Sequence, residues 1–278
     1  MKKLTLLLLF ALLLSHSTFA QKKKKRKKQV VLIETEFGDI QVRLFNETPN
    51  HKENFLKLVE EGTYDSTLFH RVISEFMIQG GDPDSKKAEK GVALGNGELG
   101  YTIPPEFVDS LFHKKGALAA ARMGDDVNPD KESSSCQFYI VQGRKFSESD
   151  LKLLEKKMNV QLKNALYQKF FDDEKNEAFR QRLMNSQQTK NQQAYQELLN
   201  EIEPGINEEY EKQKFSFSEA QIKAYSTIGG APHLDGGYTV FGEVIEGLDV
   251  VDVIAMQATD QRNRPIKDIR VKMKLVKR

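Results

Sequence analysis

The 278-residue sequence contains no tryptophan and only one cysteine, Cys136. A single cysteine cannot form an internal disulfide, so the fold must be stabilised by its hydrophobic core alone. Hydrophobic residues make up 39% of the chain, which is enough for such a core. Because Cys136 lies in a strand-like run, we interpret it as a small buried apolar side chain, with a reactive thiol as the alternative.

No hydrophobic run in the sequence reaches the length of a membrane-spanning helix. The longest run, Leu4 to Leu14, follows two lysines and precedes small residues that end near Ala20. This order is typical of a cleavable secretory signal, with an uncleaved anchor as the alternative. We therefore predict that residues 1–20 are a signal peptide and that the protein is exported to the periplasm or the cell exterior.

The sequence also lacks the patterns of metal and nucleotide sites. The five histidines show no spacing typical of metal ligands. The glycines between Gly91 and Gly100 are too irregular for a phosphate-binding loop. We therefore expect neither a metal nor a cofactor.

The formal net charge of +2 conceals two oppositely charged parts. Residues 1–28 contain nine basic residues and no acidic residue, so the rest of the chain has a net charge of −7. Seven of the nine, Lys22 to Lys28, are consecutive and repel one another, which predicts a basic disordered tail at residues 21–29. This tail is either a solvated spacer or a contact for an anionic surface such as lipid. The acidic body and the predicted export argue against nucleic-acid binding.

Alternating apolar and polar residues, which are typical of β-strands, occur in two separate parts of the chain, residues 30–146 and 229–278. Together these parts have the length of one ordinary domain. Near the start of the first part, Thr48 and Pro49 indicate the N-terminus of a helix with Thr48 as its cap.

Between these two parts, residues 147–228 are rich in charge and have leucines at helical spacing. Ser147 and Ser218 each begin a pattern typical of a helix N-terminus, whereas Pro204 and Gly205 are expected to break the helical run. We predict a helical insertion, which a domain tolerates because a long surface loop adds little closure entropy. The insertion is either a hairpin packed on the domain or an arm that grips a partner or a substrate.

The segment from Phe69 to Asp82 has the sequence F-H-R-V-I-S-E-F-M-I-Q-G-G-D and contains two strand-like runs around a short polar link. Alternation with a period of two places Arg71 on one face with Phe69, and Met77 on one face with Gln79. A charged side chain among apolar neighbours is costly unless it is paired or hydrogen-bonded, so Arg71 is expected to have either such a partner or a function.

This segment resembles the signature of the cyclophilins, peptidyl-prolyl cis-trans isomerases built on an eight-stranded antiparallel barrel. Three later stretches continue the resemblance in the same order: Gly116 to Arg122 (G-A-L-A-A-A-R), Ser135 to Val141 (S-C-Q-F-Y-I-V) and Leu234 to Val244 (L-D-G-G-Y-T-V-F-G-E-V). The resemblance implies a mainly β fold, an eight-stranded antiparallel barrel capped by helices. Residues 30–146 and 229–278 would form the barrel, with residues 147–228 as an inserted helical subdomain.

The resemblance also implies which residues form the site. Arg71 matches the catalytic arginine, and Gln79 matches the residue that orients this arginine and the substrate. The positions that form or border the seat for the substrate's proline are Phe76, Met77, Tyr139, Leu234 and Tyr238. The positions that bind the residues preceding proline are Ala121, Arg122 and Gln137. His233 stands at the rim, where the family often has tryptophan, and Arg122, Tyr139 and Tyr238 replace the asparagine, phenylalanine and histidine that are common in relatives.

Rotation about an X-Pro bond is slowed by amide resonance, with a barrier of about 18–20 kcal/mol for peptide bonds in general. A fixed hydrogen-bond donor and a dry apolar seat can stabilise the twisted amide without a nucleophile or a metal. Arginine suits this task because its planar guanidinium stays charged and presents several donors. We therefore predict a monomeric isomerase of X-Pro bonds in exported proteins, acting on proline-containing peptides and unfolded proteins. A non-catalytic chaperone that uses the same groove for binding is the alternative.

Overall fold

The structure of the chain is a computed structural model that describes residues 29–276. The predicted signal peptide, residues 1–20, and the basic run Lys22 to Lys28 lie outside the described residues. Export and the properties of the tail therefore stay predictions.

One eight-stranded antiparallel sheet forms the body of the protein, in the strand order β10-β1-β2-β9-β6-β8-β4-β3. A separate two-stranded sheet pairs β5 with β7. The eight-stranded antiparallel fold expected from the sequence is confirmed. The strands are β1 (Val30–Thr35), β2 (Gly38–Leu44), β3 (Arg71–Ile73), β4 (Met77–Gly80), β5 (Thr102–Ile103), β6 (Ala117–Ala120), β7 (Ser133–Ser134), β8 (Phe138–Val141), β9 (Val240–Glu246) and β10 (Lys272–Val276).

Six α-helices and three short 3-10 helices accompany the strands in the described part of the chain. No helix within residues 29–276 is both long enough and apolar enough to cross a membrane. The α-helices are α1 (Pro49–Glu60), α2 (Glu148–Asp172), α3 (Glu177–Gln188), α4 (Gln192–Gln213), α5 (Glu219–Thr227) and α6 (Leu248–Ala255), and the 3-10 helices are η1 (Pro83–Lys87), η2 (Glu174–Asn176) and η3 (Pro232–Leu234).

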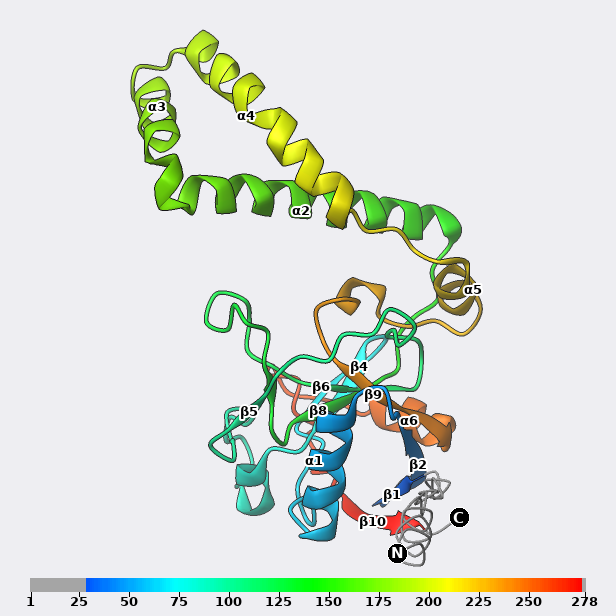
Figure 1. Ribbon diagram of the computed structural model, residues 1–278. Helices are drawn as coiled ribbons and strands as arrows, with labels where there is room; N and C mark the ends of the chain where they lie inside the picture. The colour runs from blue at the N-terminus through cyan, green and yellow to red at the C-terminus, as the bar shows by residue number, and fades with distance from the viewer. Residues whose placement is uncertain (1–28, 277–278) are drawn as a thin grey trace, which may run out of the picture.

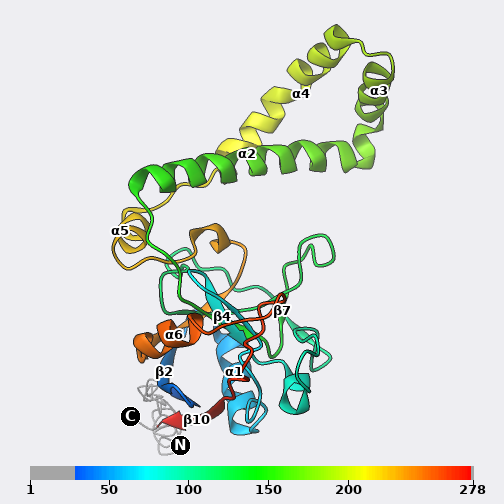
Figure 2. The ribbon, with the colours of Figure 1, turned by 180° about the vertical axis from the view of Figure 1, so that it is seen from behind.

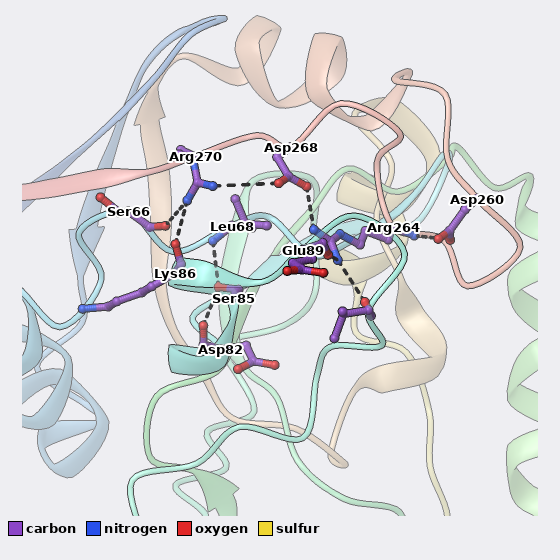
Figure 3. Close-up of polar contacts among 11 residues, drawn as sticks. Ser66, Leu68, Asp82, Ser85, Lys86, Glu89, Asp260, Arg264, Asp268 and Arg270 are labelled. Atoms are coloured by element: carbon purple, nitrogen blue, oxygen red, sulfur yellow. Dashed lines mark hydrogen bonds and ion pairs between the residues drawn. The ribbon is translucent and has the colours of Figure 1, made fainter.

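The two edges of the sheet meet, because the residues before β3 pair with the residues before β10. Leu68 and Arg270 form an antiparallel bridge, and the N–H of Ser66 donates to the carbonyl of Val271 at 2.9 Å. The guanidinium of Arg270 then donates to the carbonyls of Ser66 and Lys86, both at 3.0 Å (Figure 3). Backbone groups that would otherwise form an open sheet edge are thereby paired.

A second arginine, Arg264, lies in the loop between α6 and β10 and binds this loop to the segment that contains Glu89 and Val92. This side chain is 5% exposed, and its guanidinium donates to the carbonyls of Glu89 and Val92, both at 2.9 Å (Figure 3). Next to Arg264, the carbonyl of Asn263 accepts from the N–H of Val72 at 2.8 Å. The loop that contains Asn263 and Arg264 therefore holds the backbone of β3 in place.

Apolar side chains fill the barrel interior, and α1 and α6 cover it (Figure 1). On α1, the ring centroid of Phe55 lies 5.6 Å from that of Phe138 and 5.3 Å from that of Phe241. On α6, Val251 and Ile254 have no exposed surface. The hydrophobic core that the sequence required in the absence of disulfides therefore lies between the sheet and these two helices.

The N-terminus of α1 lies where it was predicted, after Thr48 and with Pro49 in the first turn, but the cap is not the predicted one. Thr48 occupies the N-cap position, but its side chain makes no capping hydrogen bond, and its Oγ1 has no partner among the described residues. Instead, the carboxylate of Glu106 accepts from the backbone N–H groups of Asn50 at 3.1 Å and His51 at 3.0 Å. A carboxylate from a distant segment thus replaces the local cap, and its charge also complements the helix dipole.

β3 and β4 form the predicted hairpin, and its register places the polar side chains. Arg71 lies opposite Gln79, and Gln79 lies opposite Tyr139 on β8. Directly opposed residues of antiparallel strands share a face, so these three side chains lie on the same face. The prediction for Phe69 was wrong, because the strand begins only at Arg71 and Phe69 packs in the barrel interior with Val72.

Between β8 and β9 the chain leaves the barrel and forms a helical arm. Figures 1 and 2 show α2, α3 and α4 projecting away from the barrel, with α5 at the junction. Both predicted helix starts are capping boxes, formed by Ser147 with Asp150 and by Ser218 with Gln221. These reciprocal hydrogen bonds fix where α2 and α5 begin.

α4 continues through Pro204, so the predicted break at this position is wrong. Proline inside a helix lacks an N–H donor and costs about 3 kcal/mol. Leu198, Ile202 and Ile206 form a buried face of α4, which contacts α2 and α3. Burial of each such side chain contributes about 1.5–3 kcal/mol, which together exceeds the cost of the proline.

Aromatic and aliphatic side chains around Tyr225 attach the base of the arm to the barrel. Tyr225 of α5 is fully buried, and its ring centroid lies 5.6 Å from that of Phe112 and 6.5 Å from that of Phe146. Leu151 in the first turn of α2 and Phe217 before α5 pack in the same group of side chains around Tyr225. The arm is therefore anchored at its base, whereas its distal part packs on itself.

Removal of the distal arm should leave the barrel folded. Lys163 Nζ and Glu203 Oε1 lie 3.1 Å apart, so a short glycine-containing loop can replace residues 164–202 with little closure entropy. Replacement of residues 147–228 by the same loop also removes Tyr225, which lowers the free energy of unfolding by about 3–5 kcal/mol more. Chemical denaturation measures both variants, and equal free energies of unfolding would show that the base of the arm does not stabilise the barrel.

Candidate functional site

A chain of side-chain hydrogen bonds fixes the guanidinium of Arg71. Its Nη1 donates to Oε1 of Gln79 at 3.1 Å, and Nε2 of Gln79 donates to Oε1 of Gln137 at 3.2 Å. Gln137 is 5% exposed, and its Nε2 donates to the carbonyls of Gly95 at 3.0 Å and Gly97 at 2.9 Å. Each group is oriented by the next, and the last is held by the backbone.

Arg71 itself is half-buried and has no counter-charge within hydrogen-bonding reach in the described part of the chain. Its hydrogen bond to Gln79 is the one that its side chain makes within residues 29–276. An arginine side chain carries five N–H donors. A fixed cation with unused donors is therefore displayed on this face of the barrel.

An apolar cluster lies on the same face, next to this cation. Tyr139 is opposite Gln79, and Met77 precedes Gln79 by two positions on β4. Both apolar side chains are buried, whereas the other members named below are partly exposed and form a surface above them. The cluster contains six of the predicted site residues: Phe76, Met77, Ala121, Tyr139, Leu234 and Tyr238.

Arg122 and His233 lie at the edges of the cluster. Nε of Arg122 donates to the carbonyl of Gly237 at 2.7 Å, and its guanidinium carbon lies 4.5 Å from the ring centroid of Tyr238. The ring of His233 is exposed and lies 5.3 Å from that of Phe76. The structure therefore brings all eleven predicted site residues into one region.

Sequence reasoning missed two residues that contact this region, His113 and Asp235. Nε2 of His113 lies 3.0 Å from the hydroxyl of Tyr139, and Nδ1 lies 2.9 Å from Oδ1 of Asp235. The side chains of both residues are almost fully buried. The one indication in the sequence was Tyr139, because a buried tyrosine hydroxyl needs a hydrogen-bond partner. The sequence does not show which residue is that partner.

Cys136 is adjacent in sequence to Gln137 but is 2% exposed. Burial raises the pKa of its thiol above the ordinary value, so the nucleophilic thiolate is disfavoured. No group of three or more His, Cys, Asp or Glu residues in the described part of the chain is arranged to hold a metal ion.

Two grooves flank the apolar cluster, and the helical arm supplies one wall of each. The first, about 440 Å³, is lined by Phe76 and His233 on the barrel and by Leu153 on α2, among others. The second, about 580 Å³, is lined by Tyr238 on the barrel and by Phe215 between α4 and α5, among others. A chain that enters the apolar cluster therefore meets the arm on both sides.

Residues 30–275 match the family model described as cyclophilin type peptidyl-prolyl cis-trans isomerase/CLD. A Streptococcus pyogenes protein, provisionally named a bifunctional phosphatase/peptidyl-prolyl cis-trans isomerase, is 29% identical over 243 residues, which span 86% of this chain but only 37% of that relative. Provisionally named peptidyl-prolyl cis-trans isomerases of Staphylococcus saprophyticus and Staphylococcus haemolyticus are 27% and 28% identical. These matches cover 87% and 86% of this chain, and 88% and 86% of the relatives.

A solved structure of a cyclophilin type peptidyl-prolyl cis-trans isomerase from Cryptosporidium parvum has the same fold. It matches with a TM-score of 0.50 and 21% identity, over 90% of this chain and 99% of that chain. A second structure of that protein, determined in the presence of the dipeptide Ala-Pro, gives a TM-score of 0.50 with 20% identity.

The eight-stranded barrel and the arginine beside an apolar cluster define a cyclophilin-like protein. The match of the family model to nearly the whole described chain shows that the protein belongs to the cyclophilin-type peptidyl-prolyl cis-trans isomerases. The relationship that the sequence motifs implied is confirmed, and with it the enzyme class.

His70, next to Arg71, should make the fold sensitive to mild acid. Its ring is 3% exposed, and neither ring nitrogen has a hydrogen-bond partner among the described residues. Burial lowers the pKa of His70 from 6.5 to about 4. As the pH falls below about 6.5, the unfolded chain takes up a proton that the folded chain accepts only near pH 4, so the free energy of unfolding decreases across this interval.

The variant His70→Leu removes this titration. Between pH 7 and pH 5, the parent protein should lose about 1–2 kcal/mol more of its free energy of unfolding than the variant loses. Denaturant titrations at the two pH values measure the difference. The same pH dependence in both proteins would contradict the assignment of a depressed pKa to His70.

Proposed function

We propose that this protein accelerates the isomerisation of X-Pro bonds in exported polypeptides, with Arg71 as the catalytic residue and without a covalent intermediate or a metal. One observation carries the proposal. The guanidinium of Arg71 is oriented by amide side chains, has no counter-charge among the described residues, and lies beside an apolar surface. A salt-bridged structural arginine would have a carboxylate partner instead.

The proposed mechanism is stabilisation of a twisted amide. Resonance keeps the X-Pro bond planar and gives the general peptide-bond barrier of about 18–20 kcal/mol. When the bond twists, resonance is lost and the prolyl nitrogen gains a lone pair that can accept a hydrogen bond. An N–H of Arg71 then stabilises the twisted amide more than the planar one, which lowers the barrier.

Gln79 supports this role because its Oε1 fixes the direction of the guanidinium before the substrate binds. A donor that is already oriented needs little reorganisation when charge develops in the transition state. Gln137 extends this support, since it holds Gln79 in turn. We propose that Gln137, Ala121 and Arg122 also contact the residues that precede proline.

The apolar cluster is the proposed seat for the proline ring. Buried Met77 and Tyr139 form its floor, and the more exposed Phe76 and Leu234 form its sides. Tyr238 borders the seat, and His233 lies at its rim. A seat that excludes water strengthens the hydrogen bond from Arg71, because electrostatic interactions weaken with increasing dielectric constant.

The proposed substrates are proline-containing peptides and unfolded proteins, bound by a monomer in the periplasm or outside the cell. The N-terminal apolar run supports export. The basic run Lys22 to Lys28 supports an additional contact with an anionic surface. Binding without catalysis is the alternative, but a groove used only for binding would not require a preoriented donor at Arg71.

Loss of the guanidinium should abolish most of the catalysis without unfolding the protein. We expect Arg71→Ala to lower kcat/KM for a proline tetrapeptide about 10²-fold or more, the effect of removing one preoriented donor. A protease-coupled isomerisation assay measures the rate, and circular dichroism should be unchanged.

Arg182→Ala is the matched control, because Arg182 pairs with Glu201 within the arm and lies outside the proposed site. This variant should keep the parental rate. A well-folded Arg71→Ala protein with near-parental turnover would show that the assigned mechanism is wrong.

Export is tested by expression of the full chain in a bacterial host and fractionation of the cells. The protein should appear in the periplasm or the medium, and its N-terminal sequence should begin at Gln21 if the signal is removed after Ala20. Protein that stays in the cytoplasm with residues 1–20 intact would contradict the predicted signal peptide.

A further inference from the structure

A buried carboxylate joins the helical arm to the apolar cluster. Asp235 Oδ1 accepts from the backbone N–H and from Nδ1 of His113, both at 2.9 Å. Asp235 Oδ2 accepts from Nε2 of Gln221 at 3.1 Å and from the hydroxyl of Tyr225 at 2.5 Å. Gln221 and Tyr225 both lie on α5, so four donors from two parts of the fold converge on one carboxylate.

These contacts define the hydrogen-bond direction at His113. A carboxylate only accepts, so Nδ1 of His113 must carry a proton, and with that as the only proton on the ring nitrogens Nε2 is an acceptor. Burial raises the pKa of Tyr139 and of Tyr225 well above the ordinary value, so both hydroxyls stay protonated and donate. Tyr139 therefore donates to His113, and Tyr225 donates to Asp235.

The chain of contacts ends at the floor of the apolar cluster. The ring of His113 stacks on that of Tyr139, with centroids 6.0 Å apart and an angle of 13° between the planes. The ring of Tyr139 in turn meets that of Tyr238 edge to face, at 6.0 Å. Both the hydroxyl and the ring of Tyr139 are thus held from the side of the cluster that the arm covers.

We propose that His113 and Asp235 are positioning residues of the isomerase site, and that α5 of the helical insertion sets the affinity for substrate by holding Asp235. The link acts on Tyr139, whose ring forms the floor of the proline seat. Relatives that carry phenylalanine at this position cannot make this link, because they lack the hydroxyl. The inference rests on the proposed function, since it assigns a task to residues that do not touch the substrate.

The contacts from α5 to Tyr139 depend on one another. If α5 no longer donates to Asp235, this buried carboxylate loses part of its hydrogen bonding and shifts toward other partners. His113 then follows, because Asp235 is the acceptor that fixes its ring. Tyr139 either moves with His113 or leaves its hydroxyl unpaired in a buried place, which is costly. The seat is consequently displaced while the guanidinium of Arg71 keeps its own support.

The predicted effect is therefore on KM rather than kcat. The planar and the twisted forms of the substrate both place the proline ring in the seat, so a displaced floor weakens both alike. A general loss of folded protein would instead lower the apparent kcat and leave KM unchanged. This difference separates a positioning role from a purely structural one.

A double-mutant cycle tests the link, with Tyr225→Phe and Tyr139→Phe singly and together. Each change removes one hydroxyl and keeps the ring. Tyr225→Phe alone should raise KM for a proline tetrapeptide about 3- to 10-fold, the size of one ordinary net hydrogen bond. In the Tyr139→Phe background, where the hydroxyl link is absent, the same change should alter KM less than about 2-fold.

Tyr210→Phe is the matched control within the arm, because Tyr210 lies on α4 and is not among the donors to Asp235 in the described part of the chain. It should leave KM unchanged in both backgrounds. An increase in KM that is equal in both backgrounds, or no increase in either, would overturn the link through Tyr139. If Tyr225→Phe proves unstable, Gln221→Met removes the other α5 donor to the same oxygen and takes its place in the cycle. Because Gln221 also belongs to the capping box of α5, Ser218→Ala, which weakens that box and keeps the donor to Asp235, is the control for this variant and should leave KM unchanged.

A nitrogen-15 NMR measurement tests the link independently of turnover. In the parent protein, the resonances of His113 should show a protonated Nδ1 and an unprotonated, hydrogen-bonded Nε2. Both Tyr139→Phe and Tyr225→Phe should shift these resonances, and a protonated Nε2 would contradict the assigned direction. Absence of isomerisation by the parent protein would overturn the proposed function, whereas isomerisation with KM unmoved by Tyr225→Phe would overturn only this inference.

Discussion

The site depends on one constraint: a charged guanidinium must be held beside an apolar surface without a carboxylate to neutralise it. A carboxylate partner would occupy the donors of Arg71 and keep them from a substrate. Neutral amide side chains take the place of a carboxylate: Gln79 binds the guanidinium, Gln137 binds Gln79, and neither adds a charge. The barrel makes this possible because the register of β3, β4 and β8 places Arg71, Gln79 and Tyr139 on one face.

Rigidity behind the site follows from the same constraint. A donor that acts only in a twisted transition state must already point in the right direction when the substrate arrives. Arg264 holds the loop that binds the backbone of β3, and the carbonyls of Gly95 and Gly97 hold the far end of the amide chain. The helical arm adds a different kind of support, because its α5 contacts the site through a buried carboxylate.

Much of the fold could be predicted because strand alternation and helix-start patterns are local. Both helix starts of the insertion were predicted correctly, since each pattern needs residues only three positions apart. The cap of α1 could not be predicted, because it comes from Glu106, which is more than fifty positions away from Asn50. Pro204 was misjudged for a similar reason: propensity suggests a break, but burial of α4 against its neighbours outweighs it.

The site was predictable to the extent that its motifs are contiguous. Arg71, Met77 and Gln79 lie within one segment, whereas His113, Tyr139 and Asp235 come from three distant segments. The sequence indicated that Tyr139 differs from the phenylalanine common in relatives, but not that its hydroxyl meets His113. Contacts between distant segments depend on packing, which local patterns do not encode.

The central claim is that Arg71 acts on the twisted amide and not on the bound ground state. Nuclear magnetic resonance exchange measurements on a proline peptide, with the parent protein and with Arg71→Lys, separate the affinity of the complex from the exchange rate within it. Lysine keeps the charge but loses the planar fork of donors. Stabilisation of the twisted amide by Arg71 predicts that the Arg71→Lys variant has a bound-state exchange rate at least about 10-fold slower than the parent protein, with nearly unchanged peptide affinity. Weaker binding with an unchanged bound-state exchange rate would contradict it.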